Sequence, residues 1–366
     1  MINENLLKSD ERAIYALRAL YKQYGYMPFK MSKFEEYDLY VRNKDFLISD
    51  RIITFNDTNG KLLALKPDVT LSIIKNGEDE VGCKQKVYYN ENVYRVSGST
   101  HQYKEIMQTG LECIGDIDMY DIFEAVSLAA ASLNLISADF VLDVSHLGVL
   151  SALLDESSAD ENFHRDAAHC IAEKNPHDLT RLCAEYGVPA DKAAVLAEFI
   201  GIYGDMASVI ARLEPVCVSD AAKAALDELR ALYTLLAGTP YAENIHFDFS
   251  IVNDMNYYNG IVFKGFLSGI CEGVLAGGQY DKLMRKMGRK SGAVGFALYL
   301  DLLEDLQTTS SEYDVDVLLL YDDSTPMAAL VNKMNTLTAS GKSVTAQRAV
   351  PSTLRCREIC DMREGE

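Results

Sequence analysis

The sequence is poor in basic residues, and this shortage limits the partners that the protein can have. Lys and Arg total 35 against 54 Asp and Glu, so the formal net charge is −19. Affinity for nucleic acids comes largely from Lys and Arg side chains that displace counterions from phosphates. A surface this acidic therefore weighs against tRNA as a partner, although a local basic patch is compatible with it.

Long apolar runs are also missing. No window approaches 18 uninterrupted apolar residues, so no membrane span is expected. The first ten residues carry acids early and contain no apolar stretch of the kind found in signal peptides. We therefore expect a cytoplasmic protein.

Paired cysteines are absent as well. The eight cysteines are scattered, and none forms a CxxC pair. In a cytoplasmic chain a cysteine is normally a reduced, buried thiol, whereas zinc sites have closely paired ligands. Cys356 and Cys360 have helical spacing, but no further metal ligands lie near them in the sequence. We expect structural cysteines and no metal site.

Apolar residues, by contrast, are plentiful. The chain has 366 residues and 48% hydrophobic content, which is enough for a large core and two or three domains. Apolar periodicity predicts an amphipathic helix over 9–25. Apolar runs at 51–55 and 62–65 flank an Asn59-Gly60 turn, which predicts a hairpin. Further strands are expected at 86–95, 105–115, 140–144, 244–252, 260–267 and 270–276, and helices at 118–134, 279–287 and along 146–239.

The end of the chain has a different pattern. Residues 307–312 are polar and predict a linker. An apolar strand at 315–321, a helix at 325–339 and a strand at 343–347 form a βαβ unit, after which about one more helix is expected. A segment this short is expected to dock on another surface rather than to stand as a robust domain.

The order of the elements predicts the fold class. Hairpin-rich strands with interleaved helices favour an α+β fold built on an antiparallel sheet with flanking helices. The Ala- and Leu-rich stretch at about 147–240 is expected to be a helical insertion into a domain that spans 1–306. Residues 313–366 form a separate, short α/β segment in this prediction.

Four stretches, taken together and in order, resemble the class II aminoacyl-tRNA synthetase fold in its histidyl branch. LALKPDVT (63–70) is similar to LxLRPExT, and NVYRVSG with YKEIMQTGLECIG (103–115) is similar to motif 2. NDMNYYNGIVF (253–263) is similar to the histidyl signature RGLDYYTGTVFE. LAGGQYDKLMRKMG with AVGFALYLDLL (275–303) is similar to GGRYDxLxxxxG and motif 3. The resemblance runs from about residue 10 to 306.

The departures from that family concern its ATP-handling residues. Leu302 stands where motif 3 ends in an arginine that contacts ATP phosphates, and Asn253 stands where the histidyl signature begins with an arginine. The motif 2 glutamate, the GGRYD arginine and the motif 1 proline are replaced by Ser97, Gln279 and Ser32. Positioned cations stabilise the charge that develops during activation, and losing one such donor costs roughly 3 kcal/mol. The resemblance therefore implies a chain without aminoacylation activity.

The retained positions are those that surround bound histidine in the family. Carboxylate, hydroxyl and amide oxygens can accept hydrogen bonds from an α-ammonium, and an arginine can pair with a carboxylate. A glutamate and a tyrosine can meet the two imidazole nitrogens. The resemblance implies that histidine is bound by Asp68, Thr70, Arg95, Gln108, Glu112, Tyr257 and Tyr258.

This combination resembles the family of regulatory subunits of short-form ATP phosphoribosyltransferase. The resemblance implies a non-catalytic subunit that joins a separate short catalytic subunit in a hetero-octamer. The complex would carry out the first step of histidine biosynthesis, from ATP and phosphoribosyl pyrophosphate, under feedback inhibition by histidine. A homodimeric contact, no cofactor, no tRNA and no membrane are implied as well. Residues 313–366 are similar to a truncated anticodon-binding segment.

The site residues also have simpler structural explanations. Asp68 could serve only as a helix N-cap, and Arg95 could form a surface ion pair. Gln108 and Glu112 could be solvated side chains on a sheet face. Each of these alternatives is compatible with the local sequence.

Paired residues leave similar choices open. Tyr257 and Tyr258 are expected on opposite faces of a strand, which places one of them in the core and favours Tyr258 as the polar contact. Gly277-Gly278 favours a tight turn over a phosphate cradle, because no Lys-Ser/Thr follows as in a P-loop. His146 has no partner in view and is assigned no role.

Two alternative functions both need ATP chemistry. A true histidyl-tRNA synthetase would need arginines at 253 and 302 and a full anticodon-binding domain. A free-standing synthetase-like ligase that modifies another protein would also have to activate its substrate with ATP. Histidine-dependent ATP–pyrophosphate exchange separates these alternatives from a regulatory subunit.

Overall fold

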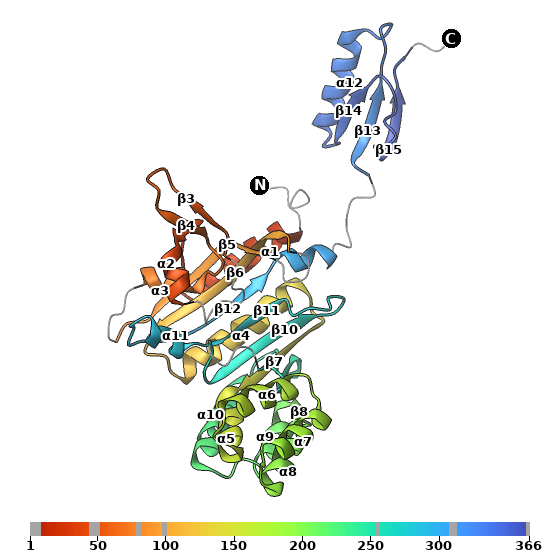
Figure 1. The fold of residues 1–366 in the computed structure, drawn as a ribbon. Coiled ribbons are helices and arrows are strands. Elements are labelled where there is room, and N and C mark those ends of the chain that lie inside the picture. Colours follow the sequence, from red (N-terminus) through yellow and green to blue (C-terminus); the bar gives the residue numbers. More distant parts are fainter. Residues whose placement is uncertain are drawn as a thin grey trace. The chain divides into compact units, whose positions relative to one another are not determined.

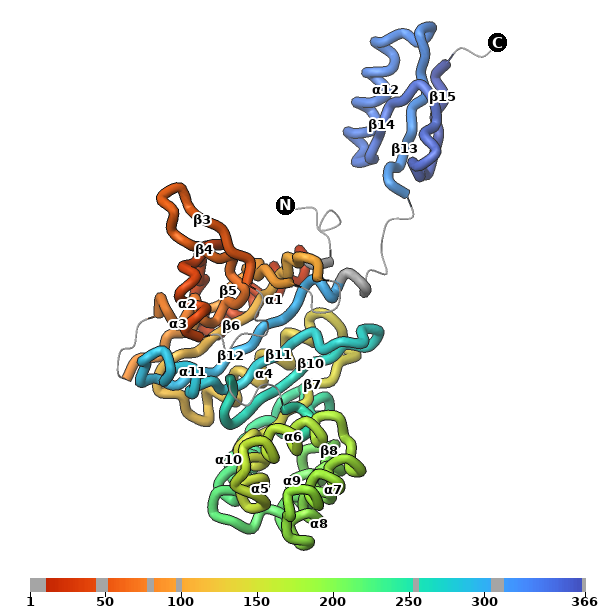
Figure 2. The backbone as a smooth tube through the Cα atoms, in the orientation of Figure 1, coloured from red at the N-terminus to blue at the C-terminus, as the bar shows by residue number. Residues whose placement is uncertain are grey.

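The chain folds into two compact units, Met1–Leu306 and Gln307–Glu366. The first unit contains a nine-stranded and a three-stranded sheet, and the second unit contains a three-stranded sheet (Figures 1 and 2). The expected linker at 307–312 lies outside the described part of the chain. This computed structural model describes residues 9–43, 52–77, 82–96, 101–252, 257–306 and 313–363.

A nine-stranded sheet forms the centre of the first unit. In sheet order its strands are β1 (Met27–Pro28), β5 (Gln85–Val96), β6 (Tyr103–Gly115), β12 (Gly292–Tyr299), β11 (Leu275–Gln279), β10 (Ile261–Leu267), β7 (Phe140–His146), β9 (Ile245–Asp248) and β8 (Tyr203–Asp205). All neighbours from β5 to β7 are antiparallel, as the α+β prediction requires. The pairs β1–β5 and β7–β9 are parallel, which the sequence pattern did not indicate.

Helices α1 (Ser9–Gln23) and α4 (Met119–Ile136) cover one face of this sheet (Figure 1). α4 begins after Asp118, whose carboxylate accepts the first free N–H groups of the helix. By length and composition alone α4 could cross a membrane, but its apolar face is buried in the main core. Gly265 of β10 permits this packing, because a Cβ there would collide with Leu133 of α4.

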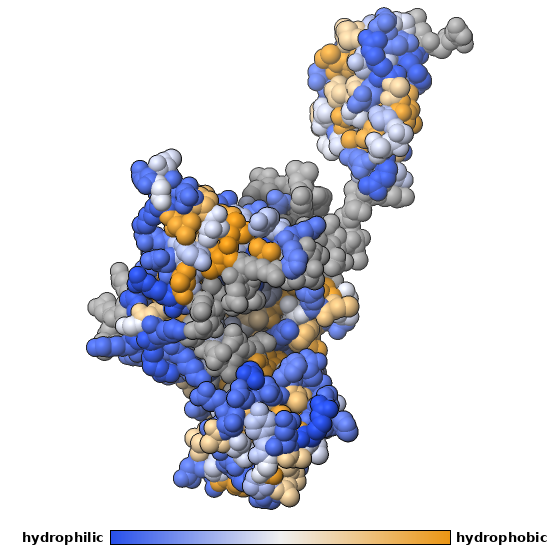
Figure 3. Space-filling model, in the orientation of Figure 1, coloured by the Kyte–Doolittle hydropathy of each residue, from blue (hydrophilic) through white to orange (hydrophobic). Residues whose placement is uncertain are grey.

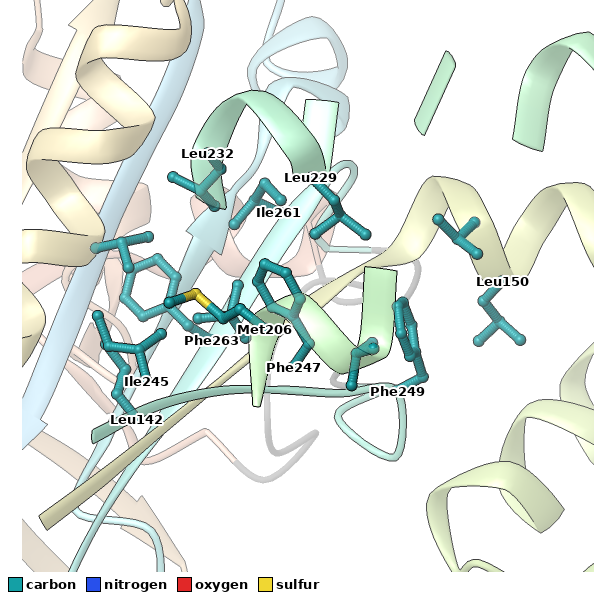
Figure 4. Packing of buried hydrophobic residues seen from close by; sticks show 14 of the residues in the cluster. Leu142, Leu150, Met206, Leu229, Leu232, Ile245, Phe247, Phe249, Ile261 and Phe263 are labelled. Atoms are coloured by element: carbon teal, nitrogen blue, oxygen red, sulfur yellow. The ribbon is translucent and has the colours of Figure 1, made fainter. Parts of the chain in front are cut away.

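The helical insertion packs against the β7 side of the sheet. Its helices are α5 (Leu147–Ser157), α6 (Glu161–Ala172), α7 (Pro176–Glu185), α8 (Ala190–Phe199), α9 (Met206–Leu213), α10 (Asp220–Leu236) and the short 3-10 helix η3 (Ala242–Asn244). Figure 4 shows Phe247 and Phe263 of the sheet beside Met206 and Leu229 of the insertion. The expected all-helical stretch is interrupted by β8, which pairs with β9 and is too short to show a periodic pattern.

A small second sheet lies over the opposite face, beside β5 and β6. In sheet order its strands are β2 (Phe34–Glu36), β4 (Leu62–Leu65) and β3 (Thr54–Asn56), and its helices are α2 (Tyr37–Arg42) and α3 (Thr70–Asn76). The predicted β3–β4 hairpin is confirmed. The Asp57 carboxylate accepts the N–H groups of Asn59 and Lys61, and Gly60 has a φ of 81°. A buried cluster that joins α3 to β5 holds this layer in place.

The segment around the two adjacent glycines differs from its prediction. The strand expected at 270–276 is β11, which starts at Leu275 and contains Gly277 and Gly278. A tight turn is therefore wrong for these glycines. A Cβ at Gly277 would collide with Phe296, so close packing between strands explains the glycine. Helix α11 (Asp281–Lys286) follows, and the 3-10 helix η4 (Asp301–Leu306) follows β12.

The second unit is a three-stranded parallel sheet with one helix. The strands are β14 (Val344–Gln347), β13 (Val315–Leu320) and β15 (Cys356–Asp361), and the helix is α12 (Met327–Ala339). The expected final helix is wrong, because that segment forms β15 along the free edge of β13. Buried backbone groups of a central strand need hydrogen-bond partners on both sides, which outweighs the helical spacing of Cys356 and Cys360.

Candidate functional site

A cavity of about 650 Å³ lies on the face of the nine-stranded sheet that is opposite α4. This volume falls within the range of about 300–1,000 Å³ that is typical of small-molecule sites. Small residues form the floor: Ala276 of β11 lies opposite Ala297 of β12, and Gly295 lies two residues away on β12. A ligand can therefore approach the backbone of the sheet closely.

All seven residues that the resemblance implied line this cavity. Side chains two or four residues apart on one strand share a face, which brings the two β6 residues to the same side of the sheet. The set comes from four segments: Asp68 and Thr70 at the start of α3, Arg95 near the end of β5, Gln108 and Glu112 on β6, and Tyr257 and Tyr258 before β10.

Glu112 is deeply buried, with 2% of the residue exposed. Its Oε1 accepts the Thr70 hydroxyl at 2.9 Å, and its Oε2 accepts the Tyr280 hydroxyl at 2.5 Å. Burial raises the pKa of Glu112 to about 8, against the opposing effect of these two hydrogen bonds. The alternative of a solvated strand-face carboxylate is therefore wrong. At neutral pH this fixed acid is therefore mostly protonated, and it can ionise when a donor or a cation arrives.

Gln108 is also buried, with 3% of the residue exposed. It lies opposite Tyr299 across the β6–β12 pair, and both side chains line the cavity. The alternative of a solvated sheet-face residue is therefore wrong for Gln108 as well.

Asp68 has two roles. Its Oδ1 accepts the N–H of Leu71 at 2.9 Å, which is a capping contact at the first turn of α3, although Val69 occupies the N-cap position itself. The same half-buried side chain lines the cavity, and burial raises its pKa. The capping explanation and the cavity role therefore hold together.

Arg95 points inward and makes no ion pair with the residues that the structure describes. Its Nε donates to the carbonyl oxygen of Pro67 at 3.0 Å. Burial raises the pKa values of Tyr299 and Asp68, and the charge of Arg95 opposes both shifts. Arg95 thus ties the segment before α3 to β5 and supplies a positive charge to the cavity.

Tyr257 and Tyr258 lie before a strand rather than in it, since β10 begins at Ile261. Their ring centroids are 4.5 Å apart, and the centroid of Tyr257 is 5.9 Å from that of Tyr280. Both rings line the cavity. Tyr257 is buried in the same cluster as Tyr280, whereas Tyr258 is only partly buried, so the expectation that one of the two packs in the core is confirmed. The alternation of a strand does not apply to this segment, and the three tyrosines form one aromatic wall.

The positions that depart from the synthetase motifs differ in their surroundings. Leu302 in η4 packs against the main hydrophobic core. Ser32 is exposed, while Asn253 and Ser97 lie outside the described residues. At the end of motif 3, Leu302 therefore places an apolar side chain packed against the core where the synthetases have a cation.

Gln279, which replaces the arginine of GGRYD, supports the tyrosine segment. Its Oε1 accepts the N–H of Ile261 at 2.8 Å and so fixes the start of β10. Gly260 has a φ of 83°, and a Cβ there would collide with the Gln279 side chain. The glutamine and the glycine together set the turn that leads from Tyr258 into the strand.

Several lining residues were not predicted. Tyr89, Tyr280, Tyr299 and Lys264 contribute side chains to the cavity. Two of them could have been found from the sequence motifs. Tyr280 belongs to the GGQYD stretch, and Lys264 stands where the histidyl signature ends in glutamate. Cys271 also lines the cavity. Like Cys83 it is exposed, so the expectation of buried thiols does not hold for all eight free cysteines.

Comparison with known proteins places the chain among synthetase relatives. The sequence profile of histidyl-tRNA synthetase matches residues 3–303. A protein of Oceanobacillus iheyensis named ATP phosphoribosyltransferase regulatory subunit is 27% identical, over 89% of this chain and 80% of its own length. A protein of the same name from Clostridium kluyveri is 29% identical, over 84% of this chain and 81% of its own length.

Solved structures agree on the fold. An ATP phosphoribosyltransferase regulatory subunit/histidyl-tRNA synthetase from Bacillus halodurans has a TM-score of 0.76 at 22% identity, covering 98% of this chain and 95% of its own. Histidyl-tRNA synthetase from Nostoc sp. PCC 7120 has a TM-score of 0.72 at 17% identity, covering 94% and 83%. A chain of the ATP phosphoribosyl transferase (HisG:HisZ) complex from Thermotoga maritima has a TM-score of 0.63 at 19% identity, covering 80% and 97%.

The predicted class II synthetase-like fold is thereby confirmed. The match of the family profile extends over most of the chain, from the first helix to the end of motif 3. The chain belongs to the histidyl-tRNA synthetase family, and the two relatives above, which match most of its length, are named ATP phosphoribosyltransferase regulatory subunits.

Proposed function

We propose that this chain is a non-catalytic regulatory subunit of ATP phosphoribosyltransferase. Relatives with that name match this chain over more than four fifths of its length. The replacement of the motif 3 arginine by Leu302, which packs in the core, argues against amino-acid activation. In this role the chain works with a separate catalytic subunit in the first step of histidine biosynthesis, in the cytoplasm, without tRNA or a cofactor.

We further propose that the cavity binds histidine as a feedback effector. The observation that carries this proposal is the buried Glu112, held by Thr70 and Tyr280 and mostly protonated at neutral pH. Once ionised, this carboxylate can accept an imidazole N–H, and the neighbouring tyrosine hydroxyls can meet the other ring nitrogen. If histidine binds one state of the assembly better, it shifts the equilibrium toward low activity, typically by about 1–3 kcal/mol.

Calorimetry on the full chain tests the effector proposal. Histidine is expected to bind, whereas amino acids without an imidazole are expected not to, because they leave buried polar groups unpaired. Glu112→Ala should abolish histidine binding and histidine inhibition of the complex while assembly, followed by size-exclusion chromatography, persists. Retained sensitivity to histidine in this variant would contradict the placement of the effector at Glu112.

Assembly as a homodimer within a hetero-octamer is also a proposal. The small sheet exposes an apolar face in which Phe34 and Phe55 pack edge to face, with ring centroids 5.3 Å apart and exposed fractions of 49% and 37%. Figure 3 shows apolar surface over this part of the molecule. We place the contact with a second copy of the chain there. Light scattering should show that Phe34→Glu lowers the mass of the isolated chain toward that of a monomer.

The competing function is that of a histidyl-tRNA synthetase. It requires histidine-dependent ATP–pyrophosphate exchange, which we expect to be absent because the activating cations are replaced. Robust exchange by the purified chain would favour the synthetase and remove the regulatory proposal.

A further inference from the structure

Strand β15 forms an open edge of the three-stranded sheet in the second unit (Figure 1). It pairs with β13 on one side, and among the residues that the structure describes no strand pairs with its other side. The backbone N–H and C=O groups along such an edge can hydrogen-bond to a further strand. β15 contains neither proline nor glycine, which would weaken such pairing.

Three residues of β15 share one exposed face, because residues two apart on a strand point to the same side. These are Arg357, Ile359 and Asp361. The other face is the one that α12 covers, where Cys360 packs in the small core of this unit. Ile359 is 50% exposed although it is apolar. The exposed face thus carries a cation, an apolar side chain and an anion, in that order.

This order is complementary to itself in one antiparallel register. When Ile359 faces Ile359 of a second copy, Arg357 of each copy faces Asp361 of the other. Side chains directly opposite each other in an antiparallel pair share a face and lie about 4.5–5.5 Å apart. Two pairs of opposite charge would therefore flank one apolar contact.

The neighbouring registers lack this match. A register centred on Glu358 places that glutamate opposite itself, and one centred on Cys360 places Arg357 opposite Arg363. Like charges directly opposite each other destabilise a strand pair. Charged residues on an edge strand usually prevent pairing. Here they disfavour the neighbouring registers and favour the one centred on Ile359.

The two charged side chains also have partners within the chain. Nη1 of Arg357 lies 3.8 Å from Oδ1 of Asp316, and Oδ1 of Asp361 accepts Nε of Arg363 at 2.8 Å. Ion pairs between exposed side chains contribute little to stability, and a carboxylate can accept several donors. These contacts therefore leave both groups able to pair with a second strand.

From these observations we propose that β15 pairs antiparallel with β15 of a second copy of this chain, with Ile359 at the two-fold axis. The sheets of the two copies then join into one continuous sheet, as in other cases of strand addition. One added strand is a small contact, so the pairing is weak for the chain alone and stronger in an assembly that already holds several copies. β15 and the contact that we place at Phe34 and Phe55 lie in different units, so each is tested separately.

Cysteine cross-linking in the full chain tests this pairing, because a disulfide traps a weak complex. Residues directly opposite each other have Cα atoms about 4.5–5.5 Å apart, which a disulfide spans. Ile359→Cys should therefore link two copies through the new cysteine under mild oxidation, as mapped by mass spectrometry of the peptides. Val350→Cys, also 50% exposed in the same unit, is the matched control and should link at least about ten-fold less. The wild type should form no link through β15, because its native cysteines do not face each other in this register.

Charge reversal tests the register. Arg357→Asp or Asp361→Arg, each combined with Ile359→Cys, places like charges opposite each other and should reduce the cross-link several-fold. A mixture of the two reversed chains restores both pairs of opposite charge and should link one variant to the other as well as the parent links to itself. Misfolding of either variant does not predict this rescue.

Three results would overturn the pairing. Ile359→Cys links no better than Val350→Cys, or the mixture of reversed chains links no better than each chain alone, or the wild type links Cys356 to Cys360 of another copy, which requires the register centred on Glu358. If the reversed chains lose assembly with the catalytic subunit while Ile359→Cys forms no link between copies, the edge belongs to that partner and the self-pairing is also refuted.

Discussion

Glu112 lies directly opposite Gly295 across the β6–β12 pair, and its carboxylate occupies the space that a side chain at position 295 would need. A Cβ on Gly295 would collide with Oε2 of Glu112 and with the carbonyl oxygen of Leu111. The backbone oxygen cannot move without disturbing the sheet. The buried acid and the glycine in the cavity floor therefore form one unit.

Gly295→Ala should consequently displace the carboxylate of Glu112. We expect histidine affinity to fall about ten-fold or more, together with a loss of about 1–3 kcal/mol in the free energy of unfolding, as for overpacked interiors. Calorimetry and urea unfolding measure the two effects. Gly238→Ala is the control, because the nearest atom to a Cβ there is the Leu235 carbonyl oxygen at 3.9 Å. Equal behaviour of the two variants would contradict the coupling of Gly295 to Glu112.

The protonation of Glu112 predicts a pH-dependent stability difference. Burial raises the pKa of Glu112 from 4.5 to about 8, so the folded chain binds this proton more tightly than the unfolded chain. The resulting stabilisation is complete below pH 4.5 and is lost as the pH rises through about 8. The glutamine in the Glu112→Gln variant cannot ionise, so the variant does not lose this stabilisation as the pH rises. Urea unfolding at pH 5, 6.5 and 8 should show the variant gaining stability relative to wild type as the pH rises.

Because other titrating groups are common to both chains, they largely cancel in this difference. A stability difference that stays constant from pH 5 to pH 8 would mean that Glu112 is ionised in the folded chain throughout. That result would also remove the neutral acid from the proposed effector site.

Gln279→Arg would restore the arginine of the GGRYD motif but should not restore synthetase behaviour. The change removes the oxygen that accepts the Ile261 N–H, and an unpaired buried donor costs about 1–3 kcal/mol. We expect lower stability and weaker histidine binding, because the turn that carries Tyr257 and Tyr258 loses its support. Gln279→Glu keeps an acceptor oxygen and serves as the control. If both variants bind histidine like the wild type, the glutamine does not position this turn.

His146, which had no predicted partner, joins β7 to the insertion. Its Nδ1 accepts the N–H of Gly148 at 3.0 Å as the N-cap of α5, so Nε2 carries the proton and lies 3.0 Å from Glu228 Oε2 of α10. His146→Ala should cost about 1–2 kcal/mol through the lost cap. Glu228 is half exposed, so Glu228→Gln should cost less than about 1 kcal/mol. Urea unfolding distinguishes the two, and a larger cost for the Glu228 change would refute the capping role.

Local sequence was a good guide where a short-range constraint decides the structure. The β3–β4 hairpin follows from a turn whose residues hydrogen-bond one another and whose glycine takes a positive φ. The capping contact at the start of α3 likewise depends on a near neighbour, because Asp68 accepts the N–H of Leu71. Such features depend on residues a few positions apart, so the sequence contains all of the information.

Prediction failed where a distant segment sets the outcome. The segment of β15 was expected to be helical, but the unpaired edge of β13 makes it a strand. Tyr257 and Tyr258 were expected to alternate across a strand, but β10 begins only at Ile261, where Gln279 of β11 accepts the N–H of that residue. In both cases the deciding hydrogen bonds come from segments that are separate in the sequence.

The sequence by itself determined the family, the set of seven candidate histidine-binding residues and the loss of the synthetase cations, because these depend on residue identity in ordered motifs. Only the tertiary structure decided how those residues behave. The pKa of Glu112 depends on burial and on hydroxyl groups from Thr70 and Tyr280, which reach it from α3 and from the end of β11. Burial and cross-strand distance arise from packing between remote segments, which no local pattern specifies.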